Sequence, residues 1–300
     1  MGDDRMKVSI IIPHYNQRDC LQRLFPTLVS QTYKDFEVIV IDDCTPDVAT
    51  VAYVKEYIKD KPFMQLVQNE VNLRFIKTCN KGIRIARGEY ICLLNSDTVL
   101  RDNFVQRNVE ILDADPGIGG LTCSIVDQHG RNCFTGGRYR HGIPTNLLDD
   151  FQGIRTSDFI AGTAVFYRKD VFDRIGTFDD NFIMYHEDIE FGLRVKKHTR
   201  YRVCTFSDKL VTHVMVPSIP RSEVWYYSSR NIVLLAKEYA PSSMPKVMAY
   251  LLIYFMVSPV VRALLAKLPV RLRFSPARIS FAIASIRGVF DGFLIKWTRP

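Results

Sequence analysis

The strongest constraint on the fold is an alternation of short aliphatic runs with amphipathic stretches over the first hundred residues. Val8–Ile12 is a run of mostly β-branched residues that ends at Pro13, and Val38–Ile41 and Tyr90–Leu94 follow the same pattern. Runs this short and this apolar are typical of strands buried on both faces of a parallel sheet. Because the stretches between them have helical spacing, the sequence predicts a doubly wound α/β sheet with right-handed crossovers.

The stretches between the runs are predicted to be helices. In residues 19–30, apolar side chains recur at helical spacing, with Asp19 as the expected N-cap. Pro26 leaves undecided which part of 19–30 forms a regular helix. Helices are also expected around 47–60 and 75–87, with a strand near Met64–Val67 between them.

The middle of the chain, residues 118–215, is predicted to be mixed α/β. It reads as a strand over 118–126, a glycine-rich loop region over 129–157, a strand near Phe159–Tyr167 and a helix from about 187 to 197.

Positive charge is concentrated at the end of the chain. The formal net charge is +8, yet residues 1–240 hold 31 basic and 31 acidic side chains. Residues 241–300 contain one acid, Asp291, and nine basic residues: Lys246, Arg262, Lys267, Arg271, Arg273, Arg278, Arg287, Lys296 and Arg299. We therefore divide the chain into a domain over 1–240, with halves of about 1–125 and 126–240, and a basic, apolar tail over 241–300.

The tail is predicted to form amphipathic helices that lie in a membrane interface. Val247–Val261 carries no charge but is interrupted by Pro259, and it is shorter than the roughly 20 apolar residues of a helical span. A second apolar segment over 279–295 carries Arg287. Basic residues beside such segments favour an anionic lipid surface. A packed helical appendage with a solvated basic face and a true span are the alternatives.

Composition excludes several classes of protein. A chain of 300 residues with 47% hydrophobic and 24% charged residues is neither disordered, nor a disulfide-stapled miniprotein, nor a polytopic membrane protein. Seven scattered cysteines without a CxxC pair indicate reduced core thiols of a cytosolic protein. The opening Met1–Lys7 is polar and Val8–Ile12 is too short for a hydrophobic signal region, so no signal peptide is expected.

Common cofactor and metal motifs are absent from the sequence. No GxGxxG follows the first strand and no GxxxxGK[ST] occurs, which argues against a dinucleotide site and a P-loop. His186-Glu187 begins like HExxH, but Glu190 breaks the pattern. The basic residues of the tail alternate with long apolar runs, which favours lipid over nucleic acid.

Polar clusters follow three of the predicted strands: His14-Tyr15-Asn16, Asp42-Asp43 and Asn95-Ser96-Asp97. Ligands of doubly wound sheets bind at these carboxyl ends. Asp97 is suited to hold Mg²⁺ or Mn²⁺ together with substrate phosphates, or else to cap a following helix. Two adjacent acids are not both expected in the core, so one of Asp42 and Asp43 should face this edge, where it can bind a base or ribose or shape a turn.

Six segments in this order resemble family 2 glycosyltransferases of the GT-A fold, over roughly residues 7–235. They are Ser9–Asn16, Val38–Asp43, Leu93–Thr98, Phe159–Ala164, Gly176–Asp179 and Tyr185–Glu190. Val211-Thr212-His213 and Tyr227–Asn231 are similar to the rhamnosyltransferase-like branch. Two departures are Asn95 in place of the first acid of the DxD motif, and Arg74 in place of a small residue, where it either reaches the donor or is solvated.

The resemblance implies a role for each matching residue. It implies that Asp188 is the catalytic base and that Asp97 and His213 bind the metal, although a helix-start acid and a buried histidine are the structural alternatives. It implies a nucleotide-sugar pocket formed by Pro13, Tyr15, Asn16, Asp43, Arg74, Asn80, Ser96, Gly162, Thr163, Glu187 and Arg230.

The expected function is that of an inverting, metal-dependent glycosyltransferase with Mg²⁺ or Mn²⁺ as cofactor. The donor would be a UDP-, dTDP- or GDP-sugar, and the acceptor a lipid-linked or oligosaccharide hydroxyl at the cytoplasmic face of a membrane, in surface glycan synthesis. One base without a second nucleophilic carboxylate implies single displacement. The alternatives are a non-catalytic nucleotide-sugar-binding or scaffold protein, which Asn95 and Arg74 would favour, and a sugar nucleotidyltransferase. The latter lacks the glycine-rich basic loop it would need after the first strand.

Overall fold

The computed structural model describes residues 6–214, 216, 220–252 and 276–295. The chain forms two compact units. The first comprises the residues up to Arg138 together with Asn146–Ile183 and Glu187–Val216, and the second Tyr139–Thr145, Met184–His186 and the described residues after Pro217. The second unit therefore begins well before the boundary predicted at residue 240.

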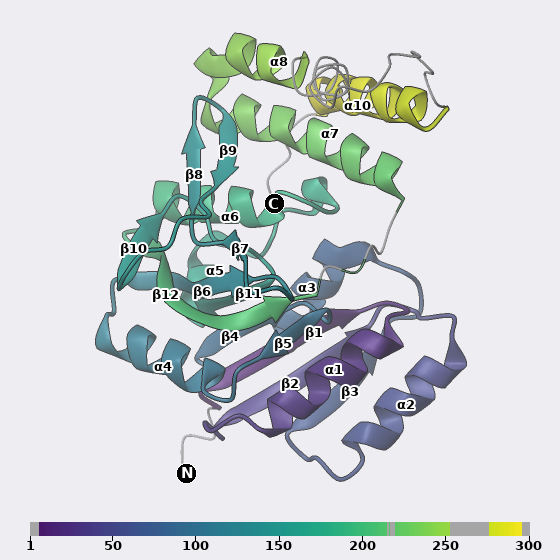
Figure 1. Cartoon of the computed structure of the whole chain (residues 1–300), viewed down its shortest axis with the longest axis vertical. Coiled ribbons are helices and arrows are strands. Elements are labelled where there is room, and N and C mark those ends of the chain that lie inside the picture. Colours follow the sequence, from purple (N-terminus) through teal and green to yellow (C-terminus); the bar gives the residue numbers. More distant parts are fainter. Residues whose placement is uncertain (1–5, 215, 217–219, 253–275, 296–300) are drawn as a thin grey trace. The chain divides into compact units, whose positions relative to one another are not determined.

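A mostly parallel sheet forms the centre of the first unit (Figure 1). The strand order along the main path is β10-β12-β6-β11-β4-β1-β2-β3, with β5 paired to β12 and β7 paired to β6. Strands β4, β1, β2 and β3 are mutually parallel, whereas β11 runs antiparallel between β4 and β6. The strands are β1 (Val8–His14), β2 (Phe36–Asp42), β3 (Met64–Gln68), β4 (Tyr90–Leu94), β5 (Thr98–Leu100), β6 (Ile118–Val126), β7 (Asn132–Phe134), β10 (Ile154–Ser157), β11 (Ala164–Arg168) and β12 (Arg202–His213).

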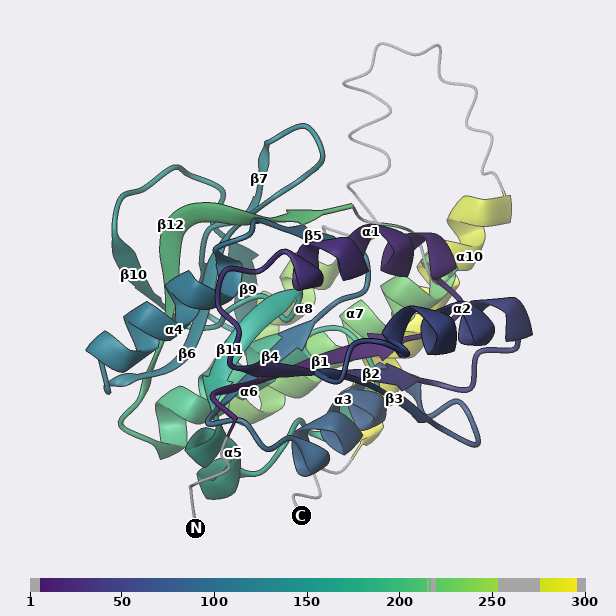
Figure 2. The ribbon, with the colours of Figure 1, turned by 90° about the horizontal axis from the view of Figure 1, so that it is seen from below.

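Helices cover both faces of this sheet. Figure 2 shows α1 and α2 on one side of β1–β3 and α3 on the other. This placement follows from right-handed crossovers, because the chain moves outward from β1 to β3 and then returns to β4 on the far side of β1. The strand order therefore reverses between β1 and β4. The helices are α1 (Arg18–Val29), α2 (Val48–Ile58), α3 (Arg74–Ile85), α4 (Phe104–Ala114), α5 (Lys169–Ile175) and α6 (Glu187–His198).

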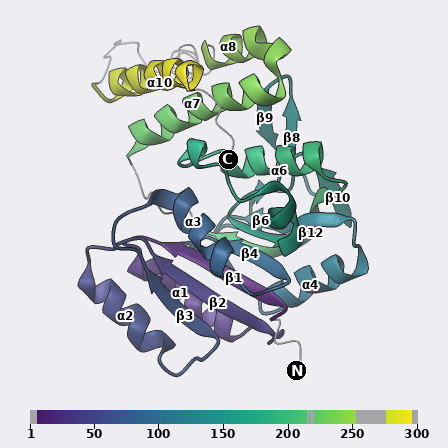
Figure 3. The same cartoon turned by 180° about the vertical axis from the view of Figure 1, so that it is seen from behind.

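The second unit is built mainly from helices α7 (Arg221–Tyr239), α8 (Met244–Leu252) and α10 (Pro276–Leu294), which lie together in Figures 1 and 3. A two-stranded sheet of β8 (Gly137–Arg140) and β9 (Ile143–Asn146) lies at the boundary of the two units in sequence. Ile232, Val233, Ala236, Val247 and Leu251 form the core of this unit. In the part of the chain that the structure describes, no helix combines the length and apolar character that a bilayer span requires.

The predicted elements of the sheet are largely confirmed. The strands at Tyr90–Leu94 and at 118–126 have the predicted bounds. β1 continues through Pro13, where the sequence predicted its end, because pairing with β4 stops at Ile11 and only the β2 side pairs further. The strand predicted near Phe159–Tyr167 begins at Ala164 instead.

Three local predictions are wrong. Gln17, not Asp19, is the N-cap of α1, and Asp19 lies in the first turn of a helix that continues through Pro26. The region 129–157 contains the short strands β7 to β10 instead of a loop. Among the cysteines, none of which forms a disulfide, Cys44 is exposed and Cys133 is partly exposed, while the other five are buried as predicted.

The predicted tail falls only partly within the described residues. The first part of the apolar run 247–261 lies in α8, and the part after Leu252 lies outside the described residues. Four of the basic residues also lie outside them: Arg262, Lys267, Arg271 and Arg273. The second apolar segment, 279–295, coincides with most of α10.

Candidate active site

The carboxyl ends of β1, β2 and β4 meet at one edge of the sheet in the first unit. His14 pairs with Asp42 in register, and the backbone N–H of Asp43 donates to the carbonyl oxygen of His14 at 2.8 Å. The strand order reverses between β1 and β4, and such a reversal opens a crevice in which α/β proteins bind ligands. The polar clusters after the three strands therefore lie where this fold places its site.

Asp97 and His213 are brought together at this edge. β12 pairs antiparallel with β5 so that His213 lies opposite Thr98, and His213 Nε2 is 3.2 Å from Asp97 Oδ2. Because a strand rather than a helix follows Asp97, the alternative role of this residue as a helix cap is excluded. Both side chains keep some exposure, 20% for His213 and 14% for Asp97, so they remain accessible to a ligand.

Asp188 is held at the start of α6 by backbone hydrogen bonds. Its Oδ2 accepts from the N–H of Gly162 at 3.0 Å and its Oδ1 from its neighbour Ile189 at 2.8 Å. The adjacent Thr163 accepts through its carbonyl oxygen from the N–H of Asn95 at 2.9 Å. One hydrogen-bonded path thus links Asp188 to the strand end that carries Asp97.

Glu187 and Asp188 have different surroundings although they are neighbours. Burial, and secondarily the charge of Asp188, raises the pKa of Glu187 to about 8. Its Oε2 atom has no hydrogen-bond partner among the described residues. Burial also raises the pKa of Asp188, but its hydrogen bonds from Gly162 and Ile189 oppose that rise. Both carboxyl groups therefore have raised pKa values, and the backbone hydrogen bonds favour the charged form of Asp188 over that of Glu187.

The prediction that one of the adjacent acids Asp42 and Asp43 lies outside the core is wrong. Both are buried, at 3% and 5% exposure. Asp43 accepts from the backbone N–H groups of Leu73 and Arg74 at 2.8 and 2.9 Å, and from Asn69 Nδ2 at 2.8 Å. These bonds hold the turn at Leu73 and Arg74, where Arg74 has a φ of 68°. Asp43 therefore has the turn-shaping role that was the alternative to binding a ligand. Its contact with a base stays a prediction, as does any donor contact of Arg74.

The loop after β1 presents Tyr15 to solvent. Tyr15 is 45% exposed, and its neighbour Asn16 has a left-handed φ of 55° with its N–H bonded to Thr45 Oγ1 at 3.0 Å. Ser96 Oγ donates to Gln17 Oε1 at 2.8 Å, which ties this loop to the end of β4. The predicted pocket residues Pro13, Tyr15, Asn16 and Ser96 thus belong to one connected edge.

Asn80 and Arg230 lie in other surroundings. Asn80 on α3 is buried, and both ends of its amide bond the backbone of Phe178, with Asp180 as a further acceptor at 3.0 Å. These contacts indicate that Asn80 positions the 178–180 segment. Arg230 lies on α7 in the second unit, with Nη1 2.6 Å from Asn231 Oδ1. Its role beside a diphosphate stays a prediction.

His14 is a residue of this edge to which the sequence assigned no role. It is buried at 3% exposure, and neither ring nitrogen has a partner among the described residues. Burial lowers the pKa of His14 to about 4, against the opposing charge of Asp42, so the ring is neutral at physiological pH. Its place at the end of β1, beside the strand-order reversal, was the signal that could have identified it.

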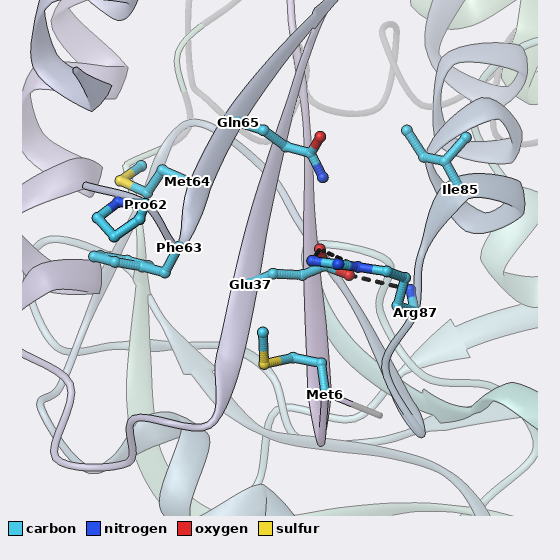
Figure 4. Close-up of a pocket in the computed structure, with 8 residues that line it drawn as sticks. All are labelled: Met6, Glu37, Pro62, Phe63, Met64, Gln65, Ile85 and Arg87. Carbon is cyan, nitrogen blue, oxygen red and sulfur yellow. Dashed lines mark hydrogen bonds and ion pairs between the residues drawn. The ribbon is translucent and has the colours of Figure 1, made fainter. Parts of the chain in front are cut away.

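A pocket of about 400 Å³ lies at the opposite, amino-terminal edge of the sheet (Figure 4). Its lining includes Glu37 and Arg87, joined by two hydrogen bonds of 2.7 and 3.1 Å. The other carboxylate oxygen of Glu37 accepts from Ser9 Oγ at 2.7 Å. Because these polar groups are already satisfied by the protein, the pocket is a weaker candidate than the carboxyl edge.

The doubly wound sheet and its polar carboxyl edge together define a domain of the GT-A fold. The sequence model of glycosyl transferase family 2 matches residues 9–176, which is more than half of the chain, and the chain belongs to this family. This confirms the family and the fold that the resemblance implied.

One relative by sequence and two solved structures are similar to this chain. The amylovoran biosynthesis glycosyltransferase AmsB of Erwinia amylovora is 26% identical over 208 residues, which are 67% of this chain and 64% of AmsB. The chain therefore spans less than two thirds of this relative. Residues 1–349 of TarS from S. aureus share the fold with a TM-score of 0.61 at 21% identity, over 95% of this chain and 81% of that one. The mannosyltransferase PcManGT of Pyrobaculum calidifontis, solved with GDP-Man and Mn²⁺, gives a TM-score of 0.60 at 16% identity, over 96% and 88% of the two chains.

Proposed function

We propose that this protein transfers a sugar from a nucleoside-diphosphate donor to an acceptor hydroxyl, with inversion, in the synthesis of a surface glycan. One observation carries the proposal: the Asp188 carboxylate accepts from the N–H of Gly162, and the next residue, Thr163, is hydrogen-bonded to Asn95 at the strand end that carries Asp97. The name of AmsB, amylovoran biosynthesis glycosyltransferase, supports the reaction class and the biosynthetic context.

Asp188 is the proposed general base. An acceptor hydroxyl must lose its proton as it attacks the anomeric carbon, and a carboxylate within hydrogen-bond reach can accept that proton. The hydrogen bonds from Gly162 and Ile189 fix the carboxylate, while burial raises its pKa toward the range in which a carboxylate is an efficient base. Glu187, which is protonated beside it, can donate a hydrogen bond through its unpartnered oxygen. With one base and no nucleophilic partner, single displacement is the expected course.

Asp97 and His213 are the proposed protein ligands of a divalent cation. The described residues contain no group of three or more metal-ligating side chains, but this carboxylate and imidazole pair lies together and is partly accessible. Two protein donors fit an ion whose remaining positions are filled by diphosphate oxygens and water. The imidazole nitrogen favours Mn²⁺ over Mg²⁺, which prefers oxygen ligands. When bound, such an ion supplies positive charge that stabilises a diphosphate leaving group.

The identity of donor and acceptor is proposed at the level of class. TarS residues 1–349 have been solved with UDP-GlcNAc and PcManGT with GDP-Man, which supports a nucleotide sugar as the donor. We propose a UDP-, dTDP- or GDP-sugar donor, with Tyr15 beside the base. The acceptor would be a lipid-linked or oligosaccharide hydroxyl at the cytoplasmic face of a membrane, because the basic tail favours a lipid surface.

A donor screen by thermal shift tests the proposal. UDP-, dTDP- and GDP-sugars are added to the full chain with and without Mn²⁺, and one donor should raise the melting temperature more when Mn²⁺ is present. A ligand at a hundred times its Kd stabilises by about 2.7 kcal/mol. Asp97→Asn should remove the Mn²⁺-dependent part of the shift, whereas Asp173→Asn, an exposed carboxylate on α5, should retain it. The absence of a shift with every donor would contradict the proposed function.

A further inference from the structure

Helix α10 presents a continuous apolar face to solvent. Large apolar side chains recur along it at three- and four-residue spacing, which places them on one side of the helix. Their exposed fractions range from 42% to 77%. We call this set the outer face of α10: Ile283, Ile286, Phe290, Phe293 and Leu294.

The other side of α10 packs against α7 (Figure 1). Gly288 and Gly292 lie on it, four residues apart, with the buried Ser285. A Cβ on Gly288 would collide with the carbonyl oxygen of Tyr226, and one on Gly292 would be 2.7 Å from the carbonyl oxygen of Arg230. The two backbones therefore approach closely, as small residues spaced by four allow.

Polar contacts fix the rotation of α10 about its own axis. Lys237 Nζ on α7 donates to the carbonyl oxygens of Gly292, Phe293 and Ile295 at 3.2, 2.9 and 2.8 Å, which satisfies the end of the helix. Tyr226 OH donates to Asp291 Oδ2 at 2.6 Å, so the single acid of residues 241–300 is engaged by α7. With this orientation fixed, the outer face cannot turn inward to bury itself.

We infer that the outer face of α10 lies in the headgroup region of an anionic membrane. Five large apolar side chains on one side of a helix form the kind of surface that interfacial helices insert. Arg287 borders this face with 77% of its side chain exposed, and residues 276–300 carry four basic residues and one acid. Anionic headgroups complement that charge.

A second copy of the chain fits the outer face less well. Two such faces in contact would bring together two tails with nine basic residues and one acid each, and like charges oppose association. The inference deepens the membrane part of the proposed function by naming the surface, and it does not depend on which sugar is transferred.

Vesicle flotation tests this inference on the full chain. We compare vesicles of phosphatidylcholine alone with vesicles that also contain phosphatidylglycerol. The wild-type protein should float with the anionic vesicles, and Phe290→Ser/Leu294→Ser should bind them at least about tenfold more weakly, because the apolar contact is lost. Val48→Ser/Val71→Ser replaces two exposed apolar residues of the first unit, at 80% and 61% exposure, and should bind like the wild type.

Two controls separate the possible outcomes. Equal vesicle binding by the Phe290→Ser/Leu294→Ser variant and the wild type would overturn the inference. So would a wild-type dimer in sedimentation velocity that this variant abolishes without any vesicle binding, because a second copy would then cover the face. The donor-induced thermal shift should be equal in all variants and so confirm their folding. If no donor shifts any variant while flotation behaves as expected, the proposed sugar transfer fails and the membrane surface stands.

Discussion

The two edges of one sheet treat their buried polar groups differently. At the amino edge, Glu37 is satisfied on both oxygens by Ser9 and Arg87. At the carboxyl edge, Glu187 Oε2 and both ring nitrogens of His14 are buried without a partner among the described residues. Glu37 at the amino edge is thus fully hydrogen-bonded by protein groups, whereas Glu187 and His14 at the carboxyl edge keep unused hydrogen-bonding capacity among the described residues.

This difference separates a structural polar network from a binding site. Buried polar atoms of native proteins are nearly always hydrogen-bonded, so an unsatisfied group calls for a partner that is present in the working state. A satisfied network such as that of Glu37 has nothing left to offer a ligand. Substitutions at the carboxyl edge should therefore change activity, and substitutions at the amino edge should change stability.

The largest expected effect is that of Asp188→Asn on turnover. The amide keeps the shape of the side chain but cannot accept a proton at neutral pH, and loss of a general base lowers rates by about 10²–10⁴-fold. The kcat of sugar transfer with saturating donor is the measurement. The donor-induced thermal shift should persist, because the change removes a reacting group rather than the pocket.

Asp180→Asn provides a matched control for Asp188→Asn. Asp180 accepts a hydrogen bond from Asn80 at the same edge, but it has no proposed part in proton transfer. Its turnover should stay near that of the wild type. Equal losses of turnover in the two variants would show that Asp188 acts only through local structure.

Glu37→Ala should act on stability instead. The substitution leaves Ser9 Oγ and the backbone N–H of Arg87 without their acceptor, and an unsatisfied buried group costs about 1–3 kcal/mol. Denaturant unfolding should show this loss, while kcat per folded molecule stays unchanged. A large fall in kcat with wild-type stability would contradict the division between the edges. Chemical denaturation of Glu37→Gln, which retains one acceptor oxygen, should show a smaller loss.

The sequence predicted the sheet better than its surroundings. Runs such as Val38–Ile41 and Tyr90–Leu94 are uniformly apolar because both faces of these strands are buried, and periodicity detects this directly. The strands within 129–157 escaped prediction because they are only three or four residues long with mixed exposure. Asp19 was assigned as a cap from residue type alone, whereas capping depends on backbone geometry that the sequence does not display.

The candidate site was predictable by position but not by hydrogen bonding. Strand ends and motif order pointed to Asp97, His213 and Asp188, which lie 25 or more residues from one another and are joined only by tertiary pairing. The same reasoning could not foresee that Asp43 is turned inward to hold Leu73 and Arg74. Side-chain partners of this kind depend on where a distant turn comes to lie.

Gly162→Ala tests the space over Asp188 and should have a moderate effect on turnover. A Cβ at this position would lie 3.4 Å from Asp188 Cβ and 3.7 Å from its Oδ2, which are ordinary contacts that the fold tolerates. Stability should change by less than about 0.5 kcal/mol. Turnover should fall by about 10–100-fold, because the added methyl group displaces a substrate that approaches the carboxylate. Wild-type kinetics in this variant would show that substrate does not approach over Gly162.

Glu187→Gln is expected to change the pH dependence of stability. The folded protein keeps the proton of Glu187 up to a pKa of about 8, whereas the unfolded chain releases it near the ordinary value of 4.5. Between these values the folded state binds more protons, so this group lowers stability as pH rises, by about 1.4 kcal/mol per pH unit at most. Glutamine is neutral throughout, so the melting temperatures of variant and wild type should be similar at pH 5 and diverge by pH 8, with the variant the more stable. Parallel melting curves across this range would mean that Glu187 is ionised in the folded protein, and its raised pKa would then be wrong.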